Sequence, residues 1–415
     1  MTRLQQQGQA AREASYTLAT AGTMKKNAAL MAIADILGER QQEWLDANAQ
    51  DVAAAQANGM RSALLDRLTL NPERIAGIVE GIRQIIALPD PIGHVDKMET
   101  RPNGLIIGRR RVPLGVIAII YEARPNVTAD AAALCLKSGN VCILRGGKEA
   151  IHSNRCVTLL MREALVSVGL PEDCISLVQD TSRETANELM HLDGYVDVLI
   201  PRGGAGLIRT VTREASVPVI RTGEGICHIY VDKEADLDMA AEILYNAKCS
   251  RPSVCNAVEC VLVQADVAGA FWKKALPLLQ EKNVELRADA RAQKLLGDSA
   301  RPASESDWDT EYDDYILAVR TVDELEEAIA FINAHGTGHS ESIVTGNYFK
   351  AQRFLDAVDA AAVYVNASTR FTDGGEFGLG AEIGISTQKM HARGPMGLEE
   401  LTSSKYVIYG EGQVR

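Results

Sequence analysis

Short apolar runs alternate with longer stretches of helical periodicity from residue 116 onward, and this alternation constrains the fold more than any other feature. The first runs are Val116–Ile120, Val141–Leu144 and Cys174–Val178, each followed by a predicted helix. Runs that are apolar at nearly every position are typical of parallel strands buried on both faces, with helices as crossover connections. The pattern predicts an α/β fold built from βαβ units.

Two successive series of such units follow one another along the chain. The first is completed by apolar runs at 196–200, 217–220 and 228–231. The second begins after Asp232 and contains predicted strands at 258–263, 315–319, 341–344 and 362–365. A chain of 415 residues is too long for one compact core. We therefore expect two α/β domains, with a boundary at residue 231.

The segments outside the two series have patterns of their own. Residues 1–90 are predicted to be helical, because Ala, Leu, Ile and Met recur at three- and four-residue spacing. A strand is predicted within 104–115, where apolar and basic residues mix. The tail Lys405–Tyr409 is predicted to be a lone strand, and two partners remain open for it: another subunit or residues 105–112.

Charge and cysteine content exclude several classes of function. A formal net charge of -12 disfavours extended nucleic-acid binding, which needs a basic face. No apolar run reaches the roughly 18 residues of a membrane span, and the polar start Met1–Gln9 lacks the core of a signal peptide. The eight cysteines have irregular spacing, which predicts neither disulfides nor a metal site and favours a reducing cytoplasm.

The segment Asn246–Asn256 is a candidate reactive loop, because it places Cys255 among polar and cationic side chains. Lys248 and Arg251 lie within seven residues of this cysteine. Nearby cations favour the thiolate, which is the nucleophilic form of cysteine. On the local sequence alone, a small buried structural cysteine remains an equal alternative.

Glycine-containing turns follow three of the predicted strands, at Leu144–Lys148, Ile200–Gly206 and Arg221–Gly225. Glycine lets the backbone approach a ligand, and the following helix offers unpaired N–H groups to a phosphate. None of the turns matches GxGxxG. The first two carry cations at the carboxyl ends of predicted parallel strands, which favours nucleotide binding there.

Two further segments carry polar side chains directly after strands. Asn126, near the start of a predicted helix, is expected either to cap that helix or to donate an amide hydrogen bond to an oxyanion. The segment Asn366–Gly375 groups Ser368, Thr369 and Arg370, and arginine is suited to gripping a carboxylate with two bonds.

These motifs together form a familiar set: Tyr121–Asn126, Leu144–Glu149, Ile200–Gly206, Ser250–Asn256, Val365–Gly375 and His391–Pro395. The set resembles the γ-glutamyl phosphate reductases, also called glutamate-5-semialdehyde dehydrogenases, a branch of the aldehyde dehydrogenase superfamily. The resemblance covers nearly the whole chain. It implies a Rossmann-type cofactor domain, a second α/β catalytic domain and a small β oligomerisation arm.

The resemblance also implies a division of the chain into domains. Residues 1–231 hold the N-terminal helices and the NADP-binding domain, with 101–115 contributing to the arm. The catalytic domain is expected at 232–369, a Gly-rich return segment at 370–394, and the oligomerisation strand at 395–415.

The implied activity is the NADPH-dependent reduction of L-glutamyl 5-phosphate to L-glutamate 5-semialdehyde and phosphate through a cysteine thioester. This is the second step of proline biosynthesis from glutamate. No metal is expected. The expected partners are copies of the chain in a homo-oligomer and the glutamate kinase that makes the labile substrate.

Site residues are carried over one at a time. Cys255 matches the thiol nucleophile and Asn126 the oxyanion donor. The substrate is expected at Ser368, Thr369 and Arg370. The expected cofactor residues are Arg145, Gly146, Gly147 and Lys148 at the adenosine ribose, Gly203, Gly204 and Gly206 at the diphosphate, and Glu311 at the nicotinamide ribose.

One position departs from the sequence pattern of the superfamily, and it distinguishes between two activities found there. Hydrolytic NAD(P)-dependent aldehyde dehydrogenases, the alternative function, place a glutamate about 34 residues before the thiol to activate water. In this chain Arg221 stands there, and Glu224 is off register. The missing base favours the reductase, because a reductase must not hydrolyse its thioester.

Overall fold

A computed structural model describes residues 1–415, apart from the side chains of residues 62, 63 and 205. The chain forms two compact units. The first unit comprises residues 1–222, 378–384 and 396–415, and the second comprises 223–377 and 385–395. Each unit contains its own parallel sheet, which confirms the predicted α/β class.

The chain begins with helices, as predicted: α1 Arg3–Leu18, α2 Thr23–Glu39, α3 Gln41–Ala57, α4 Ser62–Leu68 and α5 Pro72–Ala87. Their ends follow from local sequence. Thr2 and Gln5 form a capping box at the start of α1, and the Asn71 side chain accepts a hydrogen bond from the Arg74 N–H ahead of α5. Ile75 and Ile82 belong to the buried stripe that packs α5 inward.

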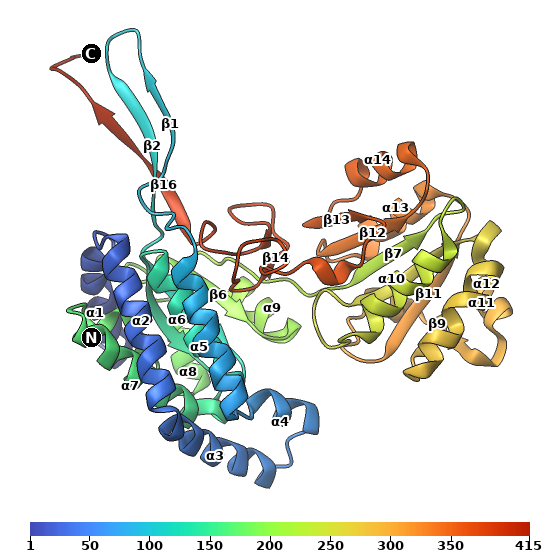
Figure 1. Cartoon of the computed structure of the whole chain (residues 1–415), viewed down its shortest axis with the longest axis horizontal. Helices are drawn as coiled ribbons and strands as arrows, with labels where there is room; N and C mark the ends of the chain where they lie inside the picture. The colour runs from blue at the N-terminus through green and yellow to red at the C-terminus, as the bar shows by residue number, and fades with distance from the viewer. The chain divides into compact units, whose positions relative to one another are not determined.

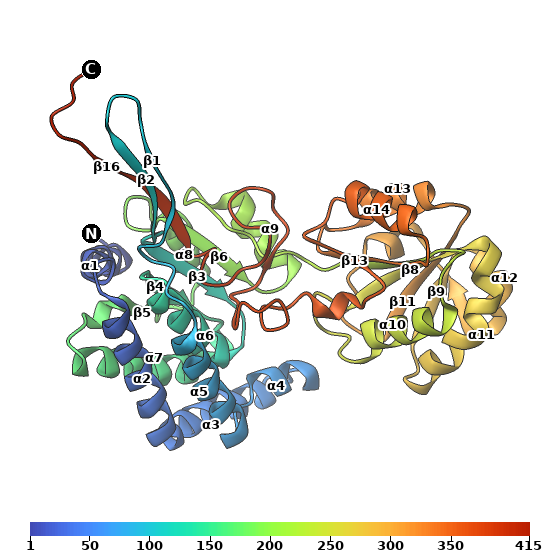
Figure 2. The same ribbon diagram turned by 45° about the horizontal axis from the view of Figure 1, so that its top comes forward.

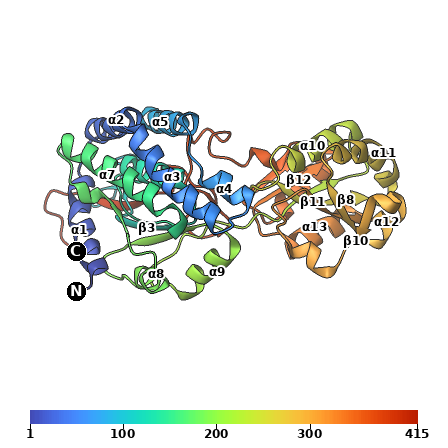
Figure 3. The same cartoon turned by 90° about the horizontal axis from the view of Figure 1, so that it is seen from below.

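The sheet of the first unit has the order β5-β4-β3-β6 and is parallel. Its strands are β3 Val116–Tyr121, β4 Val141–Arg145, β5 Ile175–Leu177 and β6 Val198–Arg202. The helices between them are α6 Pro125–Lys137, α7 Ile151–Ser167, α8 Arg183–Met190 and α9 Ala205–Glu214. Figure 3 shows α7 on one side of β3 and both α8 and α9 on the other, so the strand ends lie between two helical layers.

The sheet of the second unit is parallel and has the order β10-β9-β11-β8-β7-β12-β13. Its strands are β7 Cys227–Val231, β8 Val258–Gln264, β9 Glu285–Ala288, β10 Ala300–Pro302, β11 Ile316–Val322, β12 Ser340–Val344 and β13 Ala362–Val365. Its helices are α10 Leu237–Cys249, α11 Ala265–Glu281, α12 Ala290–Leu296, α13 Leu325–His335 and α14 Tyr348–Ala357. Figure 2 shows α13 and α14 over one face and α10 and α11 over the other.

The structure corrects the predicted place of one strand. We expected residues 228–231 to close the first series, but β7 pairs with β8 and β12 inside the second sheet. The compact units accordingly divide between Thr222 and Gly223 and not at residue 231. A short apolar run fits the middle of either parallel sheet, so its pattern does not tell which sheet it joins.

A separate antiparallel sheet of the first unit contains β1 Val95–Thr100, β2 Ile106–Pro113 and β16 Thr402–Tyr409. β16 pairs with β2 from Thr402↔Pro113 to Tyr409↔Ile106, so the tail finds its partner within the same chain (Figure 1). The alternation did not predict β1, because every residue of that strand is exposed. Within the described chain, no helix combines the length and apolarity needed to cross a bilayer.

Candidate active site

Cys255 lies on the loop between α10 and β8 of the second unit, and its side chain is half-buried. The two neighbouring cysteines differ from it. Cys249 and Cys260 are buried. Burial raises the pKa of the Cys249 thiol to about 11 and also raises the pKa of Cys260. A thiolate is therefore disfavoured at these two positions, and Cys255 is the best-placed nucleophile of the three.

The loop is supported from behind by the segment that leads into β7. A Cβ added to Gly225 would lie 1.4 Å from the Cys255 carbonyl oxygen, so only glycine fits there. The Cys227 thiol donates a hydrogen bond of 3.2 Å to the same carbonyl oxygen. These contacts fix the backbone that carries the reactive thiol, and no local motif had marked Cys227.

Lys248 does not act as the free cation that the sequence suggested. Its side chain is fully buried, and its ammonium lies 2.7 Å from the Glu259 carboxylate. The charge is thus neutralised by a buried partner on β8, which local spacing does not reveal. Arg251 is exposed on the loop itself, so it is the remaining loop cation of the predicted two.

The predicted substrate segment does lie beside the thiol loop. The Thr369 hydroxyl donates to the Asn256 carbonyl oxygen at 2.7 Å, and the Asn256 amide donates to the Thr372 carbonyl oxygen at 2.9 Å. The Ser368 hydroxyl accepts from the Arg370 N–H at 3.3 Å. Ser368 and Thr369 are buried: the Thr369 hydroxyl holds the segment against Asn256, the residue that follows Cys255, while the Ser368 hydroxyl caps the turn Thr369–Phe371 within the segment.

Arg370 also contacts the thiol loop. Its guanidinium donates to the Asn256 side-chain oxygen, and its Nε donates to the Ser250 hydroxyl at 3.2 Å. From the sequence alone, the alternative to substrate contact is an ion pair between Arg370 and Asp373 that holds the loop. The guanidinium instead bridges two loop residues, which places its positive charge next to the loop of Cys255.

Glu311 supports the same assembly. One carboxylate oxygen accepts a hydrogen bond of 2.9 Å from the Gly225 N–H. Burial raises the pKa of Glu311 to about 7, and this hydrogen bond opposes the shift. Glu311 therefore holds the glycine that contacts the Cys255 carbonyl, and it can change charge near neutral pH.

Asn126 belongs to the first unit and lies in the first turn of α6, which begins at Pro125. Its amide donates to the Asp130 carboxylate at 3.0 Å, one helical turn further on. Burial raises the pKa of Asp130 to about 6. Asn126 does not cap the helix, since its N-cap is Arg124. Asp130 orients the amide and was missed, although the i,i+4 spacing was a readable signal.

The first glycine turn of the first unit is tightly packed. Added Cβ atoms would lie 2.2 Å from the Asn154 amide nitrogen at Gly146 and 2.8 Å from the Glu149 carboxylate at Gly147. The Arg145 guanidinium donates to the carbonyl oxygens of residues 181 and 182, at 2.7 and 3.2 Å. Lys148 is exposed. The turn thus presents Lys148 outward, while Arg145 is partly occupied by the loop before α8.

The second glycine turn already binds a negative group. The Gly204 N–H, at the start of α9, donates to the Glu122 carboxylate at 3.0 Å. A Cβ at Gly203 would lie 2.7 Å from the same carboxyl group, whereas a Cβ at Gly206 would meet nothing within 4 Å. The carboxylate of Glu122 shows that this helix N-terminus accepts an anion, as a diphosphate site requires.

The structure therefore groups the predicted residues in two sets. Cys255, Glu311 and the segment 368–370 share the second unit. The first unit holds Asn126 and both glycine turns, 145–148 and 203–206. The arrangement within each set is compatible with its predicted role: a supported thiol in one, and N–H and cationic groups for phosphates in the other.

Known proteins resemble this chain over nearly its whole length. A family model described as the aldehyde dehydrogenase family matches residues 2–293 and 309–407. A gamma-glutamyl phosphate reductase of Enterococcus faecalis is 59% identical over 415 residues, covering 100% of this chain and 99% of the relative. One of Carboxydothermus hydrogenoformans is 58% identical over 405 residues, covering 98% of this chain and 97% of the relative.

Solved structures lead to the same group. The crystal structure of gamma-glutamyl phosphate reductase from Thermotoga maritima superimposes with a TM-score of 0.98 at 47% identity, covering 100% of both chains. An acetylating aldehyde dehydrogenase from Geobacillus thermoglucosidasius has 16% identity and a TM-score of 0.72, covering 100% of this chain and 97% of that one, and shares the fold. The chain belongs to the aldehyde dehydrogenase family.

Proposed function

We propose that this enzyme reduces L-glutamyl 5-phosphate to L-glutamate 5-semialdehyde and phosphate with NADPH. The observation that carries the proposal is the half-buried Cys255 on a loop supported by Gly225 and Cys227. Relatives that match over the full length are named gamma-glutamyl phosphate reductases. The product would serve as the second intermediate on the way from glutamate to proline.

The chemistry begins with the Cys255 thiolate, which attacks the acyl carbon of the substrate. The bond from that carbon to the phosphate oxygen breaks, phosphate leaves, and a thioester remains on the sulfur. Asn126 and the Cys255 N–H donate hydrogen bonds to the oxyanion of each tetrahedral species. Asp130 keeps the amide of Asn126 oriented through their hydrogen bond of 3.0 Å. The carbon–sulfur bond breaks last, which releases the semialdehyde and restores the thiolate.

A bound nicotinamide cofactor would supply the hydride that reduces the thioester. The groups that fit it are the Gly204 N–H, which donates to the carboxylate of Glu122 where a phosphate would bind, and the cations Arg145 and Lys148. Two cations ahead of a single carboxylate, Glu149, favour NADPH over NADH through the additional phosphate. Glu311 is the proposed partner of the nicotinamide ribose.

A reductase of this kind must keep water away from its thioester. Arg221 stands where hydrolytic relatives place a general base, so the chain offers a cation and not a carboxylate at that position. Reduction is therefore favoured over the alternative function, hydrolytic oxidation of an aldehyde with NAD(P).

The substrate differs from a simple acyl phosphate by its α-amino and α-carboxylate groups. Arg370 is the proposed partner of the α-carboxylate, because its guanidinium lies beside the thiol loop at Ser250 and Asn256. Ser368 and Thr369 remain proposed substrate residues, and their hydroxyls also hold the segment that carries Arg370.

Assembly is the second part of the proposal. The strand β16 exposes Tyr406, Ile408 and Tyr409 at 71, 59 and 58%. Such apolar exposure on a sheet favours contact with a second copy of the chain, so we propose a homo-oligomer formed through this sheet. A complex with glutamate kinase would protect the labile acyl phosphate.

The decisive experiment runs the reaction in reverse. We expect NADP reduction by glutamate semialdehyde only when phosphate or arsenate is present, because the thioester needs an oxyanion to leave the enzyme. Cys255→Ser should abolish this activity with the melting temperature unchanged, since an alkoxide forms far less readily than a thiolate. The matched control is Cys156→Ser, a half-buried cysteine of the first unit. NADP reduction without phosphate would instead indicate the hydrolytic alternative.

A further inference from the structure

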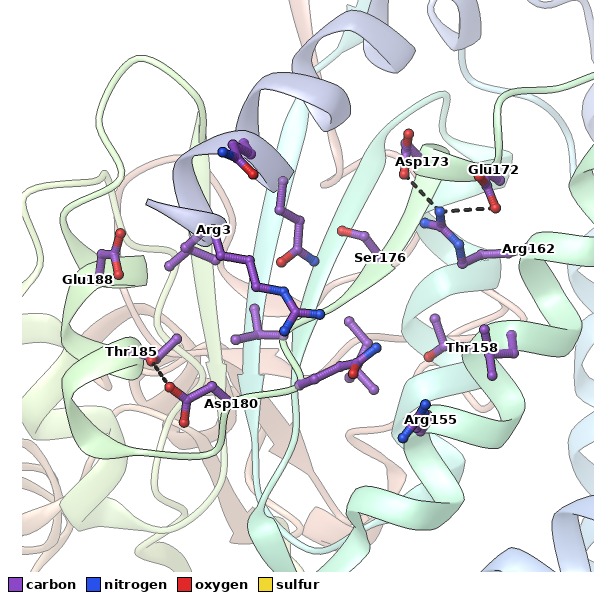
Figure 4. Close-up of a pocket in the computed structure, with 17 residues that line it drawn as sticks. Arg3, Arg155, Thr158, Arg162, Glu172, Asp173, Ser176, Asp180, Thr185 and Glu188 are labelled. Carbon is purple, nitrogen blue, oxygen red and sulfur yellow. Dashed lines mark hydrogen bonds and ion pairs between the residues drawn. The ribbon is translucent and has the colours of Figure 1, made fainter. Parts of the chain in front are cut away.

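A pocket of about 680 Å³ lies in the first unit, along the outer edge of strand β5. Figure 4 shows it between the start of α1, one face of α7 and the start of α8. The residues that carry the argument are Arg3 of α1, Arg155, Thr158 and Arg162 of α7, and Ser176 of β5. Pockets that bind small molecules have comparable volumes.

Two buried hydroxyl groups line this pocket without a partner. Thr158 and Ser176 are 3 and 4% exposed, and among the described residues neither hydroxyl has a hydrogen bond. Leaving a buried hydroxyl unpaired costs free energy, so such groups are normally satisfied by protein, by water or by a ligand. Two of them in one pocket indicate an occupant with hydrogen-bonding groups.

The partners of the polar groups around the pocket show which groups are left for an occupant. Each lining carboxylate already has a donor. Glu172 and Asp173 lie 3.1 and 2.9 Å from the Arg162 guanidinium, and Asp180 accepts from the Thr185 hydroxyl at 2.6 Å. The Thr2 hydroxyl donates to Glu188.

Two of the three arginines, by contrast, have no such partner. In the described chain, Arg3 and Arg155 form neither an ion pair nor a side-chain hydrogen bond. Figure 4 shows the Arg3 side chain reaching across the pocket. Asp180 and Glu188 keep their negative charges, because their donors are neutral hydroxyls. The groups without any hydrogen-bond or ion-pair partner are two guanidinium cations and two hydroxyl donors, which together match carboxylate or phosphate oxygens.

We propose that this pocket binds a small organic anion, bearing carboxylate or phosphate groups, as a ligand separate from the Cys255 site. Arg3 and Arg155 bind the charge, and Thr158 and Ser176 donate to oxygen atoms deeper in the pocket. The site does not depend on the chemistry of Cys255, so it can be tested by binding alone.

The position of the pocket also gives the ligand an effect. Asp180 lines it, and the next two residues provide the carbonyl oxygens that accept from Arg145 at 2.7 and 3.2 Å. An occupant beside Asp180 changes the conformation of this loop and therefore the position of the Arg145 side chain. We expect ligand binding to change the affinity for NADPH, an effect that rests on the proposed function of Arg145.

Binding is measured by calorimetry on the full chain with two probes, succinate as the dicarboxylate and glycerol phosphate as the phosphate monoester. We expect at least one to bind at millimolar concentration or below, and the tighter one identifies the class. The double change Arg3→Gln and Arg155→Gln should weaken binding at least about tenfold, because it removes two charge-assisted contacts. Arg83→Gln, an exposed arginine away from the pocket, is the control and should bind normally.

A second variant tests the hydroxyl groups without changing the charge. Thr158→Val keeps the shape but removes the unpaired hydroxyl, so the free protein should melt at the same or a higher temperature. The rise in melting temperature caused by the probe should shrink in this variant. A lower melting temperature of the free variant would show that the hydroxyl has a structural partner and would contradict the proposal.

Two further results would overturn it. The first is that neither probe binds at millimolar concentration. The second is that the double arginine variant binds like the Arg83→Gln control. Measuring probe affinity at increasing NADPH concentration distinguishes coupling between two sites from competition for one site. If the probe affinity changes but levels off at high NADPH concentration, the probe and NADPH bind separate sites. If the probe affinity keeps falling as the NADPH concentration rises, the cofactor itself occupies the pocket. Unchanged probe affinity would disprove only the coupling.

Discussion

Glu311 illustrates how single side chains far from the thiol in sequence control its surroundings. Its carboxylate holds the Gly225 N–H at 2.9 Å, and Gly225 contacts the Cys255 carbonyl. Arg370 reaches the same loop from the other side through Asn256. Both residues were predicted as ligand contacts, and both are also part of the support for Cys255. Substitutions at these positions therefore need a measurement that separates support from ligand binding.

Glu311 should make stability depend on pH. Its folded pKa of about 7 lies above the ordinary value, so the folded state favours the protonated carboxyl. Wild-type stability should then fall as the pH rises through the window between the ordinary value and about 7, by roughly 2 kcal/mol for a half-buried group. Denaturant unfolding at about pH 5 and about pH 8 should show this loss, and Glu311→Gln should lose less. Glu39→Gln, on the exposed end of α2, is the control.

Arg370→Ala should impair substrate use by about 2–4 kcal/mol in kcat/KM, as truncation of a buried charge pair does. The affinity for NADPH should remain nearly unchanged. Because Arg370 also contacts Asn256, the rate of Cys255 alkylation by iodoacetamide is measured in parallel. A large change in alkylation, or equal losses for substrate and cofactor, would contradict a role in binding the α-carboxylate. Arg301→Ala, a substitution on β10 at a side chain that is 75% exposed, is the matched control.

At the scale of elements, the groups proposed for cofactor binding lie at the carboxyl ends of parallel strands. The turn after β4 presents Lys148, and the turn after β6 leads into α9, whose first N–H groups meet Glu122. Glycine is required at 146, where an added Cβ would lie 2.2 Å from the Asn154 amide nitrogen and 3.0 Å from the Tyr121 ring. Helix N-termini and cations at these ends are the features that a dinucleotide needs.

Lys148→Glu should raise the KM for NADPH far more than the KM for NADH, because only the former carries the additional phosphate. The ratio of the two KM values is the measurement, and Lys148→Gln should give a smaller change of the same direction. Equal effects on both cofactors would show that Lys148 does not contact that phosphate.

At the scale of the whole molecule, the antiparallel sheet of β1, β2 and β16 is separate from both parallel sheets, so its role needs its own explanation. Its strands expose apolar side chains, including Met98, Tyr406 and Ile408. An exposed sheet of this kind pairs readily with another chain.

Ile408→Lys should therefore lower the molecular mass in solution, measured by light scattering during size-exclusion chromatography. The reason is that a buried lysine without a partner disfavours an interface. Thr20→Lys, an exposed position after α1, is the control and should leave the mass unchanged. A wild-type protein that is already monomeric would contradict assembly through this sheet.

The amino-acid sequence by itself determined the α/β class, most helices and strands, and the loop of Cys255. These features depend on periodicity and residue type over short stretches, which the sequence displays directly. Several predicted bounds agree with the structure, as for β13 at Ala362–Val365 and, to within one residue, β4 at Val141–Arg145.

Only the tertiary structure decided which sheet β7 joins. It alone decided that Lys248 pairs with Glu259 and that the Gly204 N–H donates to Glu122. It also decided that β16 pairs with β2 of its own chain. Each of these outcomes joins residues that are separated along the chain or could pair with several equivalent partners. Strand pairing and charge pairing depend on distance in space, so local patterns leave them open until the chain is folded.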